Sequence, residues 1–420
     1  MSYLHEEKKD KATTNFNEGY MRKNNEIYNA LLDRDVSLFH ADFIRYEGQI
    51  SKIIAESKFL VLGAGGTIGR AVSKAIFQHS PLKLHLVDLS ENNLAELVRD
   101  LRSSNANPKG KFKTFAIDIG SIEFEALYES DGDYDYVINL SALKHVRSER
   151  DPYTLMRMLQ HNVLNTKKTL QLAIEGGAKK YFSVSTDKAT NPQNLMGASK
   201  AIMESIMMHY SDRITISSAR FANVLFSDGS LLNSFENRLK KHQPLSAPFD
   251  IKRFFITEKE AGELCLISAM LAHNREIIFP KLTDKFCPLS FRELAIKYLQ
   301  AQGLKALVFD NESDARNYSK QAIPGDEWPC FWSTTDTTGE KELEEFFSTD
   351  ELINYERFDS IGVITLQSQN FEEKIVNFES KIQYFLRQRC WSKSDLVSII
   401  KEFINDLDHI ELNKSLDDKM

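Results

Sequence analysis

A glycine-rich loop directly behind a short apolar run is the feature that most constrains this chain. Residues 59–62 are all apolar, which is typical of a strand buried on both faces. Glycines after such a strand let the backbone turn tightly and approach a pyrophosphate, whose charge is met by N–H groups at the start of the next helix. We therefore expect the first unit of a dinucleotide-binding fold, with cofactor contacts from Gly63, Gly65, Gly66, Thr67, Ile68 and Gly69.

An acidic residue in the next apolar run specifies the cofactor further. Asp88 ends a predicted strand 19 residues after Gly69. A carboxylate at this place accepts hydrogen bonds from both ribose hydroxyls and repels a 2′-phosphate, so the pattern predicts NAD rather than NADP.

Strands alternate with helices through the middle of the chain. The expected strands after the first are residues 84–88, 114–118, 136–140, 180–184 and 214–218. This alternation predicts an α/β fold with a Rossmann-type doubly wound parallel sheet over residues 58–282. We expect residues 1–57 to form a helical N-terminal segment, and residues 283–420 to form a smaller mixed substrate region with a helix-rich extension.

The ends of the third and fourth expected strands supply further cofactor contacts. Asp118 and Ile119 are placed to meet the adenine. Leu140, Ser141 and Ala142 are expected to line the pyrophosphate and nicotinamide ribose from the other side of the topological switch point.

Composition excludes several classes of protein. The 420 residues carry 53 Lys and Arg against 60 Asp and Glu, a net charge of −7, which has the wrong sign for a chain that wraps nucleic acid. The four cysteines share no metal-ligand or redox spacing, so we expect buried free thiols, no metal site and a reducing compartment. No window approaches the roughly 20 apolar residues of a membrane span, so we expect a cytoplasmic protein.

A pair of opposite charges follows the fifth expected strand, at the sheet edge where open α/β folds bind ligands. The sequence there reads Ser185-Thr186-Asp187-Lys188. An adjacent acid and amine can donate and accept protons on neighbouring substrate carbons. A helix with Met196 and Lys200 in its first turns begins a few residues later.

With these motifs the chain resembles the extended short-chain dehydrogenase/reductase family, and more closely the nucleotide-sugar 4,6-dehydratases that act on UDP-N-acetylglucosamine. The resemblance covers residues 58–282. It rests on the glycine loop, residues 141–146, residues 185–189, Asn191-Pro192 with residues 196–200, and residues 220–224 with Gly229-Ser230; residues 253–257 are similar to a further family segment.

Met196 departs from the pattern of the superfamily at large. Most members carry a tyrosine four residues before the helix lysine, and its phenolate takes the hydroxyl proton during hydride transfer. A thioether carries no proton, so the usual base is missing here. The branch that this chain resembles includes active dehydratases with methionine at this position, so the departure narrows the subfamily.

The resemblance implies an internal redox cycle and assigns a role to each residue. NAD takes hydride from C4 of the sugar, the ketone acidifies the C5 proton, water leaves from C6, and hydride returns to C6. Lys188 is then the C5 base, with a pKa lowered by desolvation, and Asp187 the acid, which needs a raised pKa. Thr186 orients the C4 hydroxyl or relays its proton, and Lys200 binds the nicotinamide ribose.

Four residues are expected to bind the UDP-sugar. Asn223 and Ser230 match positions that meet the nucleotide diphosphate in relatives, and Lys144 lies near both cofactor and sugar. Arg253 offers a bidentate fork for a phosphate.

Two other functions stay open at this point. A UDP-N-acetylhexosamine 4-epimerase or 4-oxidase would share hydride removal at C4 without losing water, although the Asp187-Lys188 pair favours elimination and Met196 disfavours a tyrosine-dependent epimerase. A non-catalytic scaffold that binds NAD or a nucleotide sugar is the second alternative. For the dehydratase we expect a homo-oligomer that supplies surface glycan synthesis.

Overall fold

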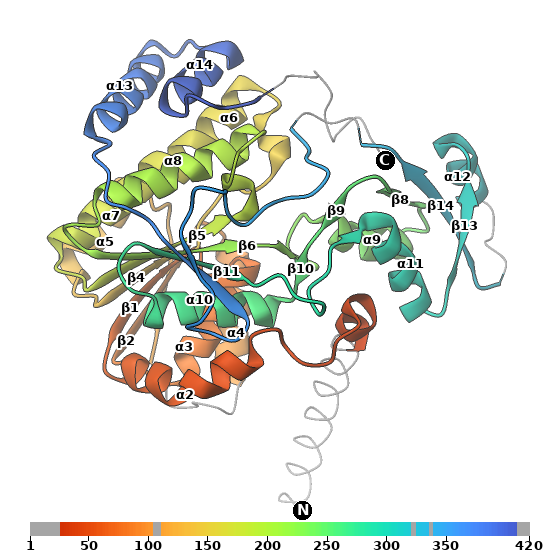
Figure 1. The fold of residues 1–420 in the computed structure, drawn as a ribbon, viewed down its shortest axis with the longest axis horizontal. Helices are drawn as coiled ribbons and strands as arrows, with labels where there is room; N and C mark the ends of the chain where they lie inside the picture. Colours follow the sequence, from red (N-terminus) through yellow and green to blue (C-terminus); the bar gives the residue numbers. More distant parts are fainter. Residues whose placement is uncertain (1–25, 104–110, 321–324, 336–338, 410–420) are drawn as a thin grey trace, which may run out of the picture.

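The computed structural model describes residues 26–103, 111–320, 325–335 and 339–409. Its main sheet has nine strands in the order β15-β16-β11-β6-β5-β4-β1-β2-β3 (Figure 1). The strands are β1 (Lys58–Leu62), β2 (Lys83–Asp88), β3 (Lys113–Ala116), β4 (Tyr136–Asn139), β5 (Lys180–Thr186), β6 (Thr215–Phe221), β11 (Glu276–Pro280), β15 (Ile353–Asn354) and β16 (Ile361–Thr365).

The strand order confirms the predicted doubly wound sheet. From β3 to β11 all neighbouring strands are parallel. The chain leaves β1 for β2 on one side and later returns to β4 on the other, which creates a topological switch point between β1 and β4. Ligands of open α/β sheets bind at such a point, beyond the carboxyl ends of the strands.

Helices cover both faces of this sheet (Figure 1). Apolar side chains of one group of helices share a core with one face: α2 (His40–Ala55), α3 (Thr67–Gln78), α4 (Glu91–Ser103) and α10 (Glu258–Leu271). The other core joins α5 (Ile122–Asp131), α6 (Pro152–Leu159), α7 (Asn165–Glu175), α8 (Leu195–His209), α13 (Glu372–Gln388) and α14 (Lys393–Phe403). No described helix combines the length and apolar character that crossing a bilayer requires.

A smaller lobe lies beside the main sheet (Figure 1). It contains a parallel sheet in the order β13-β14-β8 and has its own apolar core. Its elements are β8 (Leu245–Pro248), α9 (Leu231–Lys240), α11 (Phe291–Ala301), β13 (Lys305–Phe309), α12 (Glu312–Ser319) and β14 (Glu327–Ser333). Short strand pairs, β7 (Asn223–Val224) with β10 (Phe255–Ile256) and β9 (Lys252–Arg253) with β12 (Leu289–Ser290), connect it to the main body.

The structure also corrects details of the sequence-based expectations. The main sheet does not end with the segment before residue 283, because β16 pairs antiparallel with β11 and β15 pairs with β16. Two of the four cysteines, Cys287 and Cys390, are exposed rather than buried. The first 25 residues of the expected N-terminal helical segment lie outside the described residues.

Candidate active site

The glycine loop is folded so tightly that side chains at Gly63, Gly65 and Gly69 would not fit. Gly63 has φ +74°, and a Cβ atom added to it would lie 2.7 Å from the backbone nitrogen of Ser141. Helix α3 begins directly after Gly66 with no side-chain cap, and Thr67, Ile68 and Gly69 line a cavity of about 490 Å³. A bare helix start facing a cavity suits a pyrophosphate, so these residues fit a dinucleotide such as NAD.

Asp88 holds this loop in place. One carboxylate oxygen accepts a hydrogen bond from the Gly65 N–H at 2.9 Å, and the other accepts one from the Ser90 N–H at 2.8 Å. A carboxylate offers about four acceptor positions, so both oxygens keep capacity for ribose hydroxyls. The predicted ribose contact is compatible with this geometry and remains a prediction.

The residues after β3 and β4 differ in what they present. Asp118 is exposed and accepts a hydrogen bond from the Gly120 N–H, whereas the Ile119 side chain is buried in the core. The adenine contact expected of Asp118 and Ile119 stays a prediction. Leu140 and Ala142 line the 490 Å³ cavity.

Ser141 has a partner that sequence reasoning missed. Its hydroxyl oxygen lies 2.7 Å from Nε2 of His161, which belongs to a single π-helical turn between α6 and α7. Burial lowers the pKa of His161 to about 4, so the ring is neutral at physiological pH. The π turn is a signal of functional sites, but its hydrogen-bond pattern is visible only in a structure.

A second cavity of about 760 Å³ adjoins the first. Lys144 and Ser230, both predicted to bind substrate, line the two cavities together with His145. Burial lowers the pKa of Lys144, although Asp228 opposes this effect. The second cavity is also lined by Arg147, Arg150, Arg238 and Glu340. Its basic lining fits an anionic ligand such as a diphosphate.

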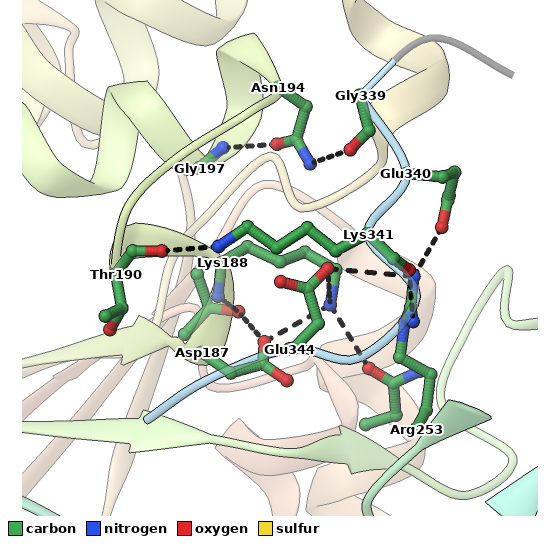
Figure 2. Close-up of polar contacts among 12 residues, drawn as sticks. Asp187, Lys188, Thr190, Asn194, Gly197, Arg253, Gly339, Glu340, Lys341 and Glu344 are labelled. Atoms are coloured by element: carbon green, nitrogen blue, oxygen red, sulfur yellow. Dashed lines mark hydrogen bonds and ion pairs between the residues drawn. The ribbon is translucent and has the colours of Figure 1, made fainter. Parts of the chain in front are cut away.

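Asp187 and Lys188, the expected acid and base, contact each other (Figure 2), and Lys188 lines the first cavity. The Lys188 ammonium lies 3.2 Å from Oδ1 of Asp187 and 3.4 Å from Oδ1 of Asn223. The Thr186 hydroxyl donates to the same Asp187 oxygen at 2.8 Å. Thr186, Lys188 and Asn223 line the cavity, while Asp187 is 1% exposed and lies behind them.

The Lys188 pKa shift in this structure has the opposite direction to the one expected beside bound NAD. Burial acts to lower the pKa, but the carboxylates of Asp187 and Glu344 outweigh it, so the pKa of Lys188 is raised above its ordinary value. Glu344 lies 3.7 Å from the ammonium and was not expected at the site. Glu344 lies after β14, outside the motifs that carry the family resemblance. No sequence pattern around it predicts a place at the site.

Met196 and Lys200 both line the cavity from the start of α8. Asn194 caps this helix, and the buried Glu149 accepts hydrogen bonds from the N–H groups of Leu195 and Met196. The Lys200 ammonium donates to the Val184 carbonyl at 3.0 Å, and burial lowers its pKa to about 8. No tyrosine lines either cavity in the described part of the chain.

Arg253 does not take the predicted place. Its side chain is 2% exposed and lines neither cavity. The guanidinium binds the Glu340 carboxylate at 2.5 Å and the Lys341 carbonyl at 2.9 Å (Figure 2). In this structure Arg253 therefore anchors a neighbouring chain segment, and the phosphate fork stays a prediction.

The polysaccharide biosynthesis protein family matches residues 59–365 of this chain. An uncharacterized membrane protein of Methanocaldococcus jannaschii is 28% identical, over 84% of this chain and 98% of that protein. The capsular polysaccharide biosynthesis protein CapD of Staphylococcus aureus is 29% identical over 61% of this chain, which spans only 42% of CapD. The UDP-glucose 4-epimerase of Rickettsia bellii is 25% identical over 86% of this chain and 98% of the epimerase.

Two solved structures share the fold. Pen from Bacillus thuringiensis has a TM-score of 0.60 at 23% identity, covering 74% of this chain and 90% of its own. The dTDP-glucose 4,6-dehydratase DesIV from Streptomyces venezuelae has a TM-score of 0.54 at 17% identity, covering 80% of this chain and 99% of its own. The likeness establishes a shared Rossmann-type fold.

Proposed function

The chain belongs to the polysaccharide biosynthesis protein family, and from this premise we propose that it is an NAD-dependent 4,6-dehydratase of UDP-N-acetylglucosamine. The product would be a 4-keto-6-deoxy sugar for glycan synthesis. The observation that carries the proposal is the contact between Asp187 and Lys188 at a cavity wall that has no tyrosine among its described residues. Elimination needs an acid and a base on neighbouring carbons, and this pair supplies both.

The two adjoining cavities support a nucleotide-sugar substrate. The larger one presents three arginines and Lys144 to a diphosphate, and the smaller one holds Lys188 and the glycine loop. Lys144 and Ser230 stand where the cavities meet. A sugar would therefore reach the catalytic pair while its diphosphate stays among the basic residues.

The residues divide the proton transfers among them. When bound, NAD supplies the hydride acceptor and later the hydride donor. The Thr186 hydroxyl passes the C4 hydroxyl proton to Asp187, to which it is already hydrogen-bonded. Asp187 thereby becomes a carboxylic acid, and the loss of its charge lowers the pKa of the adjacent Lys188.

The same geometry completes the cycle with balanced protons. Once Asp187 is neutral, the Lys188 ammonium releases its proton to solvent. The free amine then takes the C5 proton, and Asp187 gives its proton to the departing C6 hydroxyl, which leaves as water. The Lys188 ammonium then returns a proton to C5 once hydride has reached C6. The free amine regains a proton from solvent, so the pair ends as an ammonium and a carboxylate, the state in which it began.

Product analysis tests the proposal. The full chain with NAD and UDP-N-acetylglucosamine in D₂O should yield a sugar with a C6 methyl group and deuterium at C5, read by NMR. Lys188→Met should reduce the rate by roughly 10²- to 10⁴-fold, while the exposed control Lys52→Gln should not.

Two results would contradict the dehydratase. An intact C6 hydroxymethyl with inverted C4 would make the chain a 4-epimerase, the activity named for its Rickettsia relatives. No turnover with unchanged NAD binding in Lys188→Met and wild type alike would favour the scaffold.

A further inference from the structure

A chain segment far from the catalytic motifs lies against the catalytic pair. We name residues Gly339–Glu344 the 339–344 segment; it follows β14 and precedes β15. Figure 2 shows it beside Asp187 and Lys188, with side chains from both parts of the chain pointing toward one another. Several independent hydrogen bonds and ion pairs hold the segment in this position.

Backbone and side-chain hydrogen bonds fix the segment at three places. Asn194, the cap of α8, donates to the Gly339 carbonyl at 3.1 Å. Lys341 donates to the Thr190 carbonyl at 3.0 Å, and the Lys252 N–H donates to the Glu342 carbonyl at 3.0 Å. Gly339 itself has φ +70°, and an added Cβ would lie 2.6 Å from the Asn194 side chain, so the approach requires glycine.

These bonds bring Glu344 to the catalytic lysine. Its carboxylate lies 3.7 Å from the Lys188 ammonium and 3.7 Å from the Arg253 guanidinium, and its side chain is 2% exposed. Neither carboxylate oxygen has a hydrogen-bond partner among the described residues. Burial raises the pKa of Glu344, and these two cations, rather than hydrogen-bond donors of its own, favour its charged form.

We propose that Glu344 is a positioning residue of the catalytic centre, which holds the Lys188 ammonium against Asp187 and sets the pH at which this lysine releases its proton. This assignment rests on the proposed function for the use of Lys188 as a base. The charged groups that face Glu344 are Lys188 and Asp187 from the catalytic turn, Arg253 from β9, and Lys341 from its own segment. Glu340 adds a second carboxylate on Arg253.

The sign of the effect follows from these charges. A carboxylate close to an ammonium favours the charged form, and Glu344 contributes to the raised pKa of Lys188. Replacing Glu344 by glutamine removes one negative charge and keeps the shape. Lys188 should then titrate at a lower pH than in the wild type.

Lys188 can be titrated directly, without any turnover. Trace labelling with acetic anhydride at a series of pH values, followed by mass spectrometry, reports the free-amine fraction of Lys188 in the full chain. We expect the midpoint to fall in Glu344→Gln and to return most of the way in Glu344→Asp. The exposed neighbour Glu342→Gln is the matched control and should leave it unchanged.

Labelling of Lys188 tests the positioning role of Glu344, and product analysis tests the dehydratase, so the two hypotheses can fail separately. An unchanged midpoint in a folded Glu344→Gln protein would overturn the positioning role. A shifted midpoint in a protein that makes no 4-keto-6-deoxy sugar would reject the dehydratase and keep the positioning role. In an active dehydratase, C5 deuterium exchange should shift to lower pH in the same variant, whereas a purely structural role would scale the profile down at every pH.

Discussion

Two cavity-lining groups, Thr186 and Lys188, meet at a single buried oxygen. Both contact Oδ1 of Asp187, at 2.8 and 3.2 Å, and Asp187 itself lies behind the cavity wall. In the proposed mechanism the Asp187 carboxylate receives a proton through the Thr186 hydroxyl. Its charge also sets the pKa of the Lys188 amine. Its burial strengthens both interactions, because the local dielectric constant is low.

Substitution of Thr186 tests the transfer of the C4 hydroxyl proton to Asp187. Thr186→Val keeps the branched shape and removes the donor to Asp187, so oxidation at C4 should slow by roughly 10²-fold. Thr186→Ser should restore most of the rate. The near-ultraviolet absorbance of reduced nicotinamide in a single turnover measures this step. A valine variant with the wild-type rate would show that the proton leaves by another route.

At the scale of elements, the catalytic turn depends on how helices are tied to strands. Helix α8 is fixed at its start by Asn194 and Glu149, which places Met196 and Lys200 at the cavity. Helix α10 is fixed at its end by Lys180 of β5, whose ammonium donates to the Ser268 and Ala272 carbonyls. Strand β5 ends at Thr186. The contact between Lys180 and α10 therefore helps to fix the strand that carries Thr186 to the cavity.

The buried Lys180 predicts a pH dependence of stability. Burial lowers its pKa from 10.5 to about 7, whereas the unfolded chain keeps the ordinary value. Between these values the unfolded state binds more protons than the folded state, so the free energy of unfolding should rise from about pH 7 toward pH 10.5. Lys180→Met should flatten this rise.

Urea unfolding at several pH values across that window measures the effect. The exposed Lys52→Gln serves as the control for a general change in charge. An equal slope for Lys180→Met and wild type would mean that Lys180 stays protonated in the folded state, held by its two carbonyl partners and by Glu276, which opposes the shift.

At the scale of the whole molecule, the sequence was informative where function depends on contiguous residues. The glycine loop, the doubly wound parallel sheet and the position of Thr186 and Lys188 at the carboxyl edge of that sheet could be predicted, because each is indicated by residues in or next to a single strand. Glu344 and the burial of Arg253 could not, since both depend on where the chain after β14 returns. No periodicity or spacing encodes a contact between residues so far apart.

Arg220 forms two buried ion pairs, one of which holds the stretch of chain that follows Glu344. The Arg220 guanidinium in β6 binds Glu204 of α8 on one side and Glu351 on the other, each at 2.8 Å. Glu351 also accepts a hydrogen bond from the Ser348 N–H at 2.8 Å. One arginine therefore connects the Rossmann core, the catalytic helix and the stretch of chain that leads from Glu344 to β15.

Weakening the contact between Arg220 and Glu351 should change two quantities, the free energy of unfolding and the titration midpoint of Lys188. Glu351→Gln removes a charged acceptor from a buried arginine, so the free energy of unfolding should fall by about 1.5–3 kcal/mol, measured by urea denaturation. Because Glu351 lies only a few residues beyond Glu344, the loosened segment should also lower the Lys188 titration midpoint, though by less than Glu344→Gln does. Asp350→Asn, exposed on the same stretch, should change neither quantity. A loss of stability with an unchanged Lys188 midpoint would show that the 339–344 segment keeps its place through Arg253, Asn194 and Lys341 alone.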